Sequence, residues 1–285
     1  MKTLGIFGDS YAEHYNRAVT CHRFDRAGTV WPANLFIEDI RKEYPCWGSL
    51  LPFNTTTHAA GGADVQHCLT TFLEHQQKYD KIIVVITHVG RHTFNVNNQQ
   101  FKITNVASVK QFMREWKNDT MMHKLFGAIR DNMTHVYPFT NERDILFWEL
   151  CIAHIRQIRP DAKFILAFNP GDQLTNTIKL NLNSPISCLH DIYELENTLI
   201  YGNKGLTDDA AEWDARMGHL TTESHLILRD LILTQLDNGD QWLNFDLKEF
   251  KDINPDINRY RVDSFNTVNE WMKYNNINTG IDDGK

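Results

Sequence analysis

Short apolar runs alternate with longer segments of helical periodicity along most of this chain. The runs at residues 2–7, 81–87 and 163–168 are apolar on both faces, which is typical of strands buried in a parallel sheet. A weaker, threonine-rich alternation at residues 53–57 indicates a further strand. Because the run Lys81–Thr87 is unbroken, we expect it at the centre of the sheet, between the strands at 2–7 and 163–168.

Apolar residues at helical spacing separate these runs. They predict helices over residues 31–40, 65–73, 145–158 and 222–236. Residues 198–201 indicate a short last strand. Strands that alternate with helices predict an α/β protein with a doubly wound parallel sheet.

Two segments depart from this alternation. Residues 95–141 are polar and partly helical, and connections of that length are often lids or binding surfaces. The chain after residue 240 is polar and rich in asparagine, with four aromatic residues that could dock it: Trp242, Phe245, Phe250 and Trp271. We therefore expect an α/β domain over residues 1–240, a partly helical insertion at about 95–141, and a polar C-terminal extension over 241–285.

Candidate chemistry collects where the predicted strands end. The first strand runs into Gly8–Asp9–Ser10, and a serine on a tight strand-to-helix turn presents its oxygen to solvent, as a nucleophile must. The same tripeptide is also compatible with an ordinary turn and helix N-cap. Gly61–Gly62, Thr87–Gly90 and Asn169 follow the other strands, so we expect them along the same sheet edge.

A serine nucleophile needs a base to take its proton. Thirteen histidines are present, and the most suitable is His219, on the loop before the last predicted helix and near Asp214. His225 lies six residues later, inside that helix, and is expected to be structural.

Together, Gly8–Asp9–Ser10, Gly61–Gly62 and the late His219 resemble the SGNH (GDSL) hydrolase superfamily, over about residues 2–235. The resemblance implies a flavodoxin-like three-layer α/β/α sandwich with a central parallel sheet, and the activity of a serine ester hydrolase. It also implies Ser10 as nucleophile and His219 as general base, with the amides of Ser10 and of Gly61 or Gly62 donating to the oxyanion. No cofactor is expected.

Two positions depart from the family pattern. His92 stands where the asparagine of a Gly-x-Asn block is expected, and its imidazole can donate one hydrogen bond to the oxyanion. The family spaces its acid and base as Asp-x-x-His, whereas Asp214 lies five residues before His219 and position 216 is arginine. Two arrangements therefore stay open: a triad in which Asp214 orients His219 through a different loop path, and a Ser–His dyad.

Four residues near the sheet edge are considered for binding substrate or a metal ion. Asp9 and Arg91 are predicted to bind substrate, with Arg91 directed to an anionic or carbonyl group; alternatively, Arg91 is a solvated side chain paired with a surface acid. His88 and His92 have the spacing of a metal pair on a helix. Because Gly90 and the strand exit argue against a helix there, we expect no metal site.

Charge and composition restrict the classes of partner and the cellular compartment that we expect. A net charge of -7 argues against nucleic acid as a partner, and no apolar run is long enough to span a membrane. The five cysteines are scattered without a Cys-x-x-Cys pair, which indicates reduced thiols in a reducing compartment. The first residues contain no long apolar segment of a signal peptide, so a cytoplasmic protein is expected.

The expected substrate is a small-molecule or glycan ester, such as an acetylated carbohydrate, by family analogy. Gly90–Arg91 and the later Arg-x-Gly-His-Leu-Thr resemble divergent bacteriophage members, which would make the protein a virion component. The alternative is a non-catalytic binding or structural module on the same fold, because the asparagine and the aspartate spacing are missing. The oligomeric state is left open.

Overall fold

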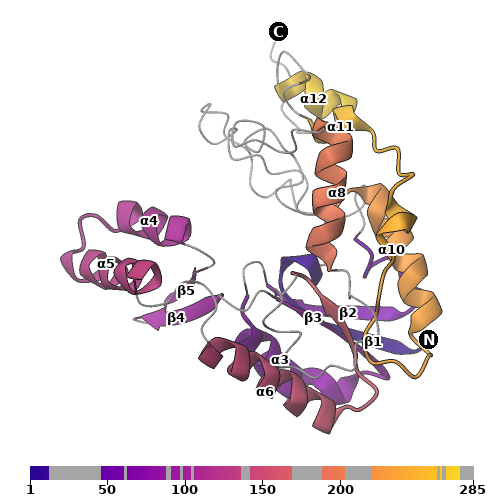
Figure 1. Cartoon of the computed structure of the whole chain (residues 1–285), viewed down its shortest axis with the longest axis horizontal. Helices are drawn as coiled ribbons and strands as arrows, with labels where there is room; N and C mark the ends of the chain where they lie inside the picture. The colour runs from indigo at the N-terminus through magenta and orange to yellow at the C-terminus, as the bar shows by residue number, and fades with distance from the viewer. Residues whose placement is uncertain are drawn as a thin grey trace. The chain divides into compact units, whose positions relative to one another are not determined.

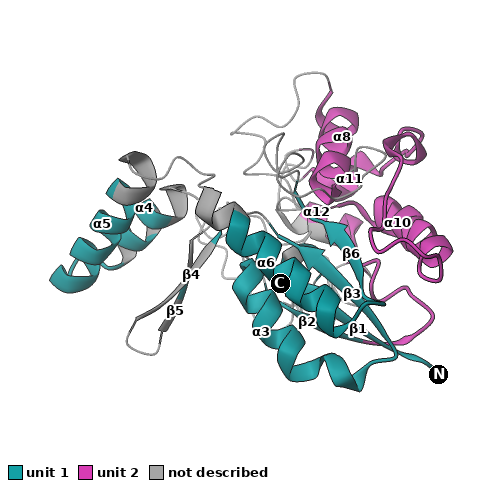
Figure 2. Cartoon of the chain, turned by 60° about the horizontal axis from the view of Figure 1, so that its bottom comes forward, with its two compact units in different colours: residues 1–12, 56–185 teal, residues 13–55, 186–285 magenta. Residues whose placement is uncertain are grey.

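A computed structural model describes residues 1–12, 46–60, 63–87, 91–96, 99–103, 106–135, 142–168, 188–202, 220–261, 264 and 268–276. The chain divides into two compact units, one of residues 1–12 and 56–185 and the other of residues 13–55 and 186–285 (Figure 2). No helix within the described residues is both long and apolar enough to cross a bilayer.

The centre of the fold is a four-stranded sheet. Its strands are β1 (Thr3–Gly8), β2 (Asn54–Ala59), β3 (Lys81–Ile86) and β6 (Lys163–Leu166), in the order β2-β1-β3-β6. β3 pairs in parallel with both β1 and β6, which confirms its predicted central place (Figure 1). The α/β class is therefore confirmed, and this strand order is that of flavodoxin-like sheets.

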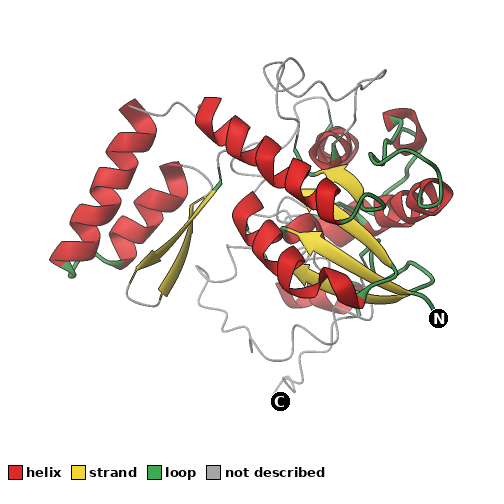
Figure 3. Ribbon diagram, turned by 90° about the horizontal axis from the view of Figure 1, so that it is seen from below, coloured by secondary structure: helices red, strands yellow, loops and turns green. Residues whose placement is uncertain are grey.

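Two helices of the first unit cover one face of this sheet (Figure 3). They are α3 (Val65–His75) and α6 (Glu142–Ile158), which pack side by side. α3 begins where the Asp64 side chain accepts a hydrogen bond from the His67 amide, and it buries Val65, Cys68 and Phe72 at helical spacing. Both helices were predicted from their apolar periodicity. The predicted helix at 31–40 lies outside the described residues.

Between β3 and α6 the chain forms a hairpin and two helices. The hairpin pairs β4 (His92–Val96) with β5 (Gln99–Ile103), and α4 (Val106–Glu115) and α5 (Thr120–His135) follow. This insertion has a small hydrophobic cluster of its own, with Phe101, Val109, Met122 and Phe126 at its centre. The helices agree with the partly helical prediction, whereas the hairpin was not foreseen.

The described elements of the second unit are mainly helical. They are α8 (Leu189–Tyr201), α10 (Thr222–Gln235), η3 (Leu247–Phe250), α11 (Ile257–Tyr260) and α12 (Val268–Tyr274). The strand predicted at 198–201 is wrong, because these residues form the last turn of α8. The inner face of α8 includes the buried polar residues Glu196 and Asn197, which interrupt the apolar periodicity. The four aromatic side chains of the C-terminal segment are buried.

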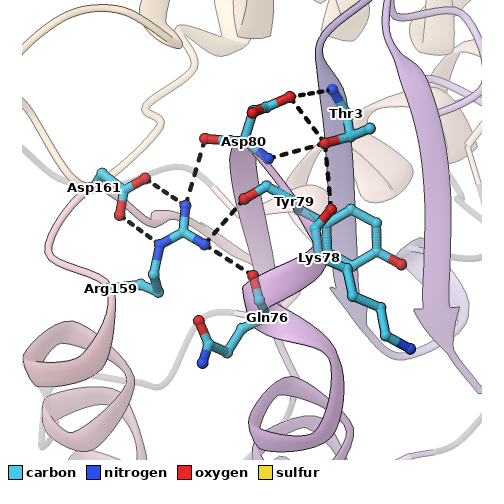
Figure 4. A network of polar contacts seen from close by, with 7 residues as sticks. All are labelled: Thr3, Gln76, Lys78, Tyr79, Asp80, Arg159 and Asp161. Carbon is cyan, nitrogen blue, oxygen red and sulfur yellow. Dashed lines mark hydrogen bonds and ion pairs between the residues drawn. The ribbon is translucent and has the colours of Figure 1, made fainter.

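Arg159 joins three segments at the amino-terminal edge of the sheet (Figure 4). Its guanidinium donates to the backbone oxygens of Gln76 at 2.9 Å, Tyr79 at 3.1 Å and Asp80 at 3.4 Å, and it forms two bonds with the Asp161 carboxylate. Asp80 in turn accepts hydrogen bonds from the amide and hydroxyl of Thr3, where β1 begins. The network holds β1, the loop before β3 and the loop before β6 together at the edge opposite the candidate chemistry.

Candidate active site

The turn that follows β1 requires glycine at its start. Gly8 has φ of 154°, and a Cβ added there would lie 2.7 Å from the Val85 backbone oxygen and 2.8 Å from the Val85 Cβ. The strands β1 and β3 are therefore in close contact just before Ser10, which opens the short helix η1 (Ser10–Ala12). The amide of Ala12 closes the turn by donating to the Asp9 backbone oxygen at 2.9 Å. This backbone geometry fixes the position of Ser10 at the carboxyl end of β1.

The Asp9 side chain lies at the centre of this sheet edge and is fully buried. Its Oδ1 accepts a hydrogen bond from the Tyr11 amide at 3.0 Å. Its Oδ2 accepts one from the Thr87 hydroxyl at 3.1 Å, where β3 has just ended, and one from Arg91 Nη1 at 2.5 Å. Because a buried carboxylate is costly without partners, these three donors account for its presence there.

Arg91 lies over the ends of three elements. Its Nη1 also donates to the Thr87 hydroxyl at 2.8 Å, and its guanidinium stacks over the Phe168 ring at 4.8 Å from the centroid. Phe168 follows β6 and makes an edge contact with Tyr11 at 5.5 Å between centroids. Only 11% of the Arg91 side chain is exposed. Since the pair is buried and the ring lies on one face of the guanidinium, Arg91 is held in one orientation.

Helix α6 supports the same edge from beneath. Trp148, which is buried, donates from Nε1 to the backbone oxygen of Thr87 at 3.1 Å. The end of β3 is therefore fixed through its backbone by Trp148 and through its side chain by Asp9.

Two buried thiols lie near this edge. Burial raises the pKa of Cys68 far above its ordinary value, and the charges of Asp9 and Asp64 and the Cys151 thiol add to the shift. Burial raises the pKa of Cys151 to about 11, with Asp64 contributing. A thiol is nucleophilic only as a thiolate, so both groups are unreactive at neutral pH. The raised pKa values therefore argue against either cysteine as a nucleophile at this edge.

The structure brings together part of the predicted site. Asp9, the turn that carries Ser10, and Arg91 meet at the carboxyl edge, and His92 begins β4, where it pairs in register with Ile103. The other predicted site residues, Gly61, Gly62, Asp214 and His219, lie outside the described residues, as does His88 of the considered metal pair. Within the described parts of the chain, no group of three or more His, Cys, Asp or Glu side chains is arranged to hold a metal ion.

In the second unit, two residues that follow His219 closely in the sequence, Thr221 and His225, make buried polar contacts. The fully buried Glu196 carboxylate accepts from the Thr221 amide at 2.9 Å and from the Thr221 hydroxyl at 2.6 Å. Thr221 is the N-cap of α10, so Glu196 fixes the start of that helix. His225, inside α10, is buried, and its Nδ1 accepts a hydrogen bond from the Trp47 amide at 3.3 Å. That contact gives His225 a structural role.

Sequence reasoning did not single out Tyr11, Trp148 or Phe168, or the side-chain role of Thr87. Thr87 and Phe168 each follow a buried strand, which was a usable signal. The Trp148 contact carries no such signal, because it depends on how α6 crosses the sheet.

No protein-family model matches the chain, and no curated protein matches it. Among solved structures, the chain is similar to the lipase/acylhydrolase from Enterococcus faecalis, with 12% sequence identity and a TM-score of 0.27. That match covers 83% of this chain and 95% of the other. At this identity and TM-score the likeness assigns no role to any residue of this chain.

Proposed function

We propose that the protein is a serine ester hydrolase, with Ser10 as nucleophile and His219 as general base. The observation that carries the proposal is the Gly8–Asp9–Ser10 turn. It stands at the carboxyl end of a parallel strand, where α/β proteins place their reactive groups, and it is held by a fully buried carboxylate. A turn that is fixed from below keeps the backbone of its serine in one position, as nucleophilic catalysis requires.

In the proposed reaction, Ser10 Oγ attacks the ester carbonyl while its proton passes to His219. The carbonyl π pair moves onto oxygen, and backbone amides of Ser10 and of Gly61 or Gly62 donate to that oxyanion. When the oxyanion collapses, the bond to the alkoxy oxygen breaks, and the leaving group takes the proton from His219. Water, deprotonated by His219, then attacks the acyl-serine by the same steps and releases the acid. Asp214 would orient the imidazole.

The proposed substrate is a short acyl ester on a small alcohol or a carbohydrate. The second candidate is a non-catalytic binding or structural module, and the observation that favours it is the departure at His92 and Asp214 from the family pattern.

A fluorophosphonate probe tests the proposal directly, because it phosphonylates an activated serine. Wild-type protein, Ser10→Ala and Ser264→Ala are treated with the probe, and the modified peptide is identified by mass spectrometry. Ser264 is an exposed serine in the second unit and serves as the control. We expect labelling at Ser10 in the wild type and in Ser264→Ala, and none in Ser10→Ala.

The same three proteins are then assayed on p-nitrophenyl acetate and on an acetylated carbohydrate. Loss of hydrolysis in Ser10→Ala alone would support the esterase. A folded wild type that neither takes the probe nor hydrolyses either ester would overturn the proposal and favour the binding module.

A further inference from the structure

Among the described residues, the Arg91 guanidinium donates hydrogen bonds from one nitrogen only. Nη1 donates to Asp9 and to Thr87, and the Phe168 ring occupies one face. Within the described residues, Nε and Nη2 have no acceptor. A guanidinium carries five N–H donors in a rigid fork, and the Arg91 side chain that carries this one is 11% exposed. Its remaining donors therefore point in fixed directions and have no acceptor among the described residues.

These donors lie close to the turn that carries Ser10. Asp9 and Ser10 are adjacent, so their Cα atoms are about 3.8 Å apart. The Asp9 carboxylate reaches forward along this turn to accept from the Tyr11 amide at 3.0 Å, and it also accepts from Arg91 Nη1 at 2.5 Å. Arg91 is thereby linked, through the Asp9 carboxylate, to both residues that flank Ser10.

We propose that Arg91 supplies the side-chain donor to the oxyanion, through Nε–H or an Nη2–H, in the role that the family gives to an asparagine. The inference rests on the proposed esterase function and deepens it. When Ser10 Oγ bonds to the carbonyl carbon, the π pair moves onto the carbonyl oxygen, which accepts the hydrogen bond from Arg91. When the leaving group departs, the pair returns to the carbonyl, and no proton is transferred to or from Arg91.

The buried ion pair suits Arg91 to this role. Asp9 neutralises the guanidinium in the free enzyme and holds its plane, so the donor needs no reorganisation as negative charge develops on the substrate. Hydrogen bonds from a charged donor to a charged acceptor are about twice as strong as neutral ones. Arg91 also lies directly before His92, so the side-chain donor is displaced by one residue from the position that the family pattern predicts.

The test compares Arg91→Lys, Arg91→Ala and His92→Ala with the wild type on a short acyl ester. Lysine keeps a positive charge for Asp9 but lacks the fork, so this variant separates the oxyanion role from the ion pair. We expect kcat of Arg91→Lys to fall about 10²-fold with KM within a few-fold, because the bond forms chiefly in the transition state. His92→Ala should lose less kcat than Arg91→Lys, because the inference moves the side-chain donor from position 92 to Arg91.

Chemical rescue provides the second readout. Added guanidinium should raise kcat of Arg91→Ala about 10-fold or more, at concentrations where the melting temperatures of all forms are unchanged. Arg229→Ala, which removes a guanidinium paired with the adjacent Asp230 on α10, is the matched control and should show no rescue. If Arg91→Ala does not fold, Arg91→Lys alone decides the question.

Three results would overturn the inference while leaving the esterase intact: a kcat for Arg91→Lys near that of the wild type, a loss confined to KM, or a loss of kcat in His92→Ala instead. A wild type without turnover on any ester, and without probe labelling, overturns the proposed function and this inference with it.

Discussion

Replacing Arg159 with alanine should destabilise the fold without altering the chemistry at Ser10. The Arg159 side chain is 17% exposed, and its guanidinium lies at the amino-terminal edge of the sheet, where it binds three backbone oxygens and Asp161 (Figure 4). Arg159→Ala removes these donors together, so the loop before β3 and the loop before β6 lose their common partner.

The structure sets the size of the effect. The bonds to Gln76 at 2.9 Å and Tyr79 at 3.1 Å are well formed, and a hydrogen bond to a charged group contributes about 1.5–3 kcal/mol. The bond to Asp80 at 3.4 Å adds little. The Asp161 carboxylate is 55% exposed, so that ion pair contributes at most about 1 kcal/mol. We expect a loss of about 3–6 kcal/mol for Arg159→Ala, and of less than about 1 kcal/mol for Asp161→Asn.

Thermal unfolding followed by circular dichroism measures both variants. At about 2–4 °C per kcal/mol, the melting temperature of Arg159→Ala should fall by about 6–24 °C, while probe labelling at Ser10 at 25 °C stays at the wild-type level. Hydrogen bonds from Arg159 lower the pKa of Asp161 below its ordinary 3.8. Its contribution is therefore present above that pH and is lost as the pH falls through the folded-state pKa, so wild type and Asp161→Asn should become equally stable in strong acid. A fall for Asp161→Asn as large as for Arg159→Ala at pH 7 would refute the reasoning, because it would place the stabilisation in the ion pair.

Three further predictions concern single residues. His219→Ala should lose esterase activity as completely as Ser10→Ala, and the double variant should be no worse than either, because the two act as a unit; additive losses in kcat would separate them. His225→Ala should retain kcat but lower the melting temperature, since the buried Trp47 amide loses its acceptor, at a cost of about 1–3 kcal/mol; loss of kcat in the folded variant would contradict this. Gly8→Ala should cost about 2 kcal/mol or more in urea unfolding, because its Cβ would lie 2.7 Å from the Val85 oxygen; a cost within 0.5 kcal/mol would show that β1 can move away from β3.

The elements of the sheet could be predicted because burial on both faces leaves a direct trace in the sequence. Leu4–Phe7, Lys81–Ile86 and Lys163–Leu166 are apolar runs of strand length, and all three became strands. The hairpin of β4 and β5 was missed because its strands are mostly polar. No helix was predicted over α8, and its last turn was predicted as a strand because Thr198 and Ile200 favour strands, whereas packing of its buried face decides for helix.

The candidate site could be predicted only where its residues are neighbours in the sequence. Ser10 and Asp9 follow the first strand, so their place at the sheet edge follows from the sequence. The contacts of Asp9 depend on register instead: Phe7 lies opposite Val84, and Ile86 lies opposite Leu166. That register brings Asp9 level with the end of β3, where Thr87 is, and places Phe168 beside it. Nothing in the local sequence specifies the register, so the partners of Asp9 could not be foreseen.

The bond between Arg91 and Asp9 also couples two parts of the first unit. Arg91 directly precedes β4, so it joins the hairpin-and-helix insertion to the turn that carries Ser10. A displacement of β4 must either carry the guanidinium with it or leave a buried carboxylate short of a partner. Any ligand that binds the insertion and favours one position of β4 would therefore alter the affinity of the Ser10 turn for its own ligand. By thermodynamic reciprocity, occupancy of that turn would alter the affinity of the insertion by the same factor.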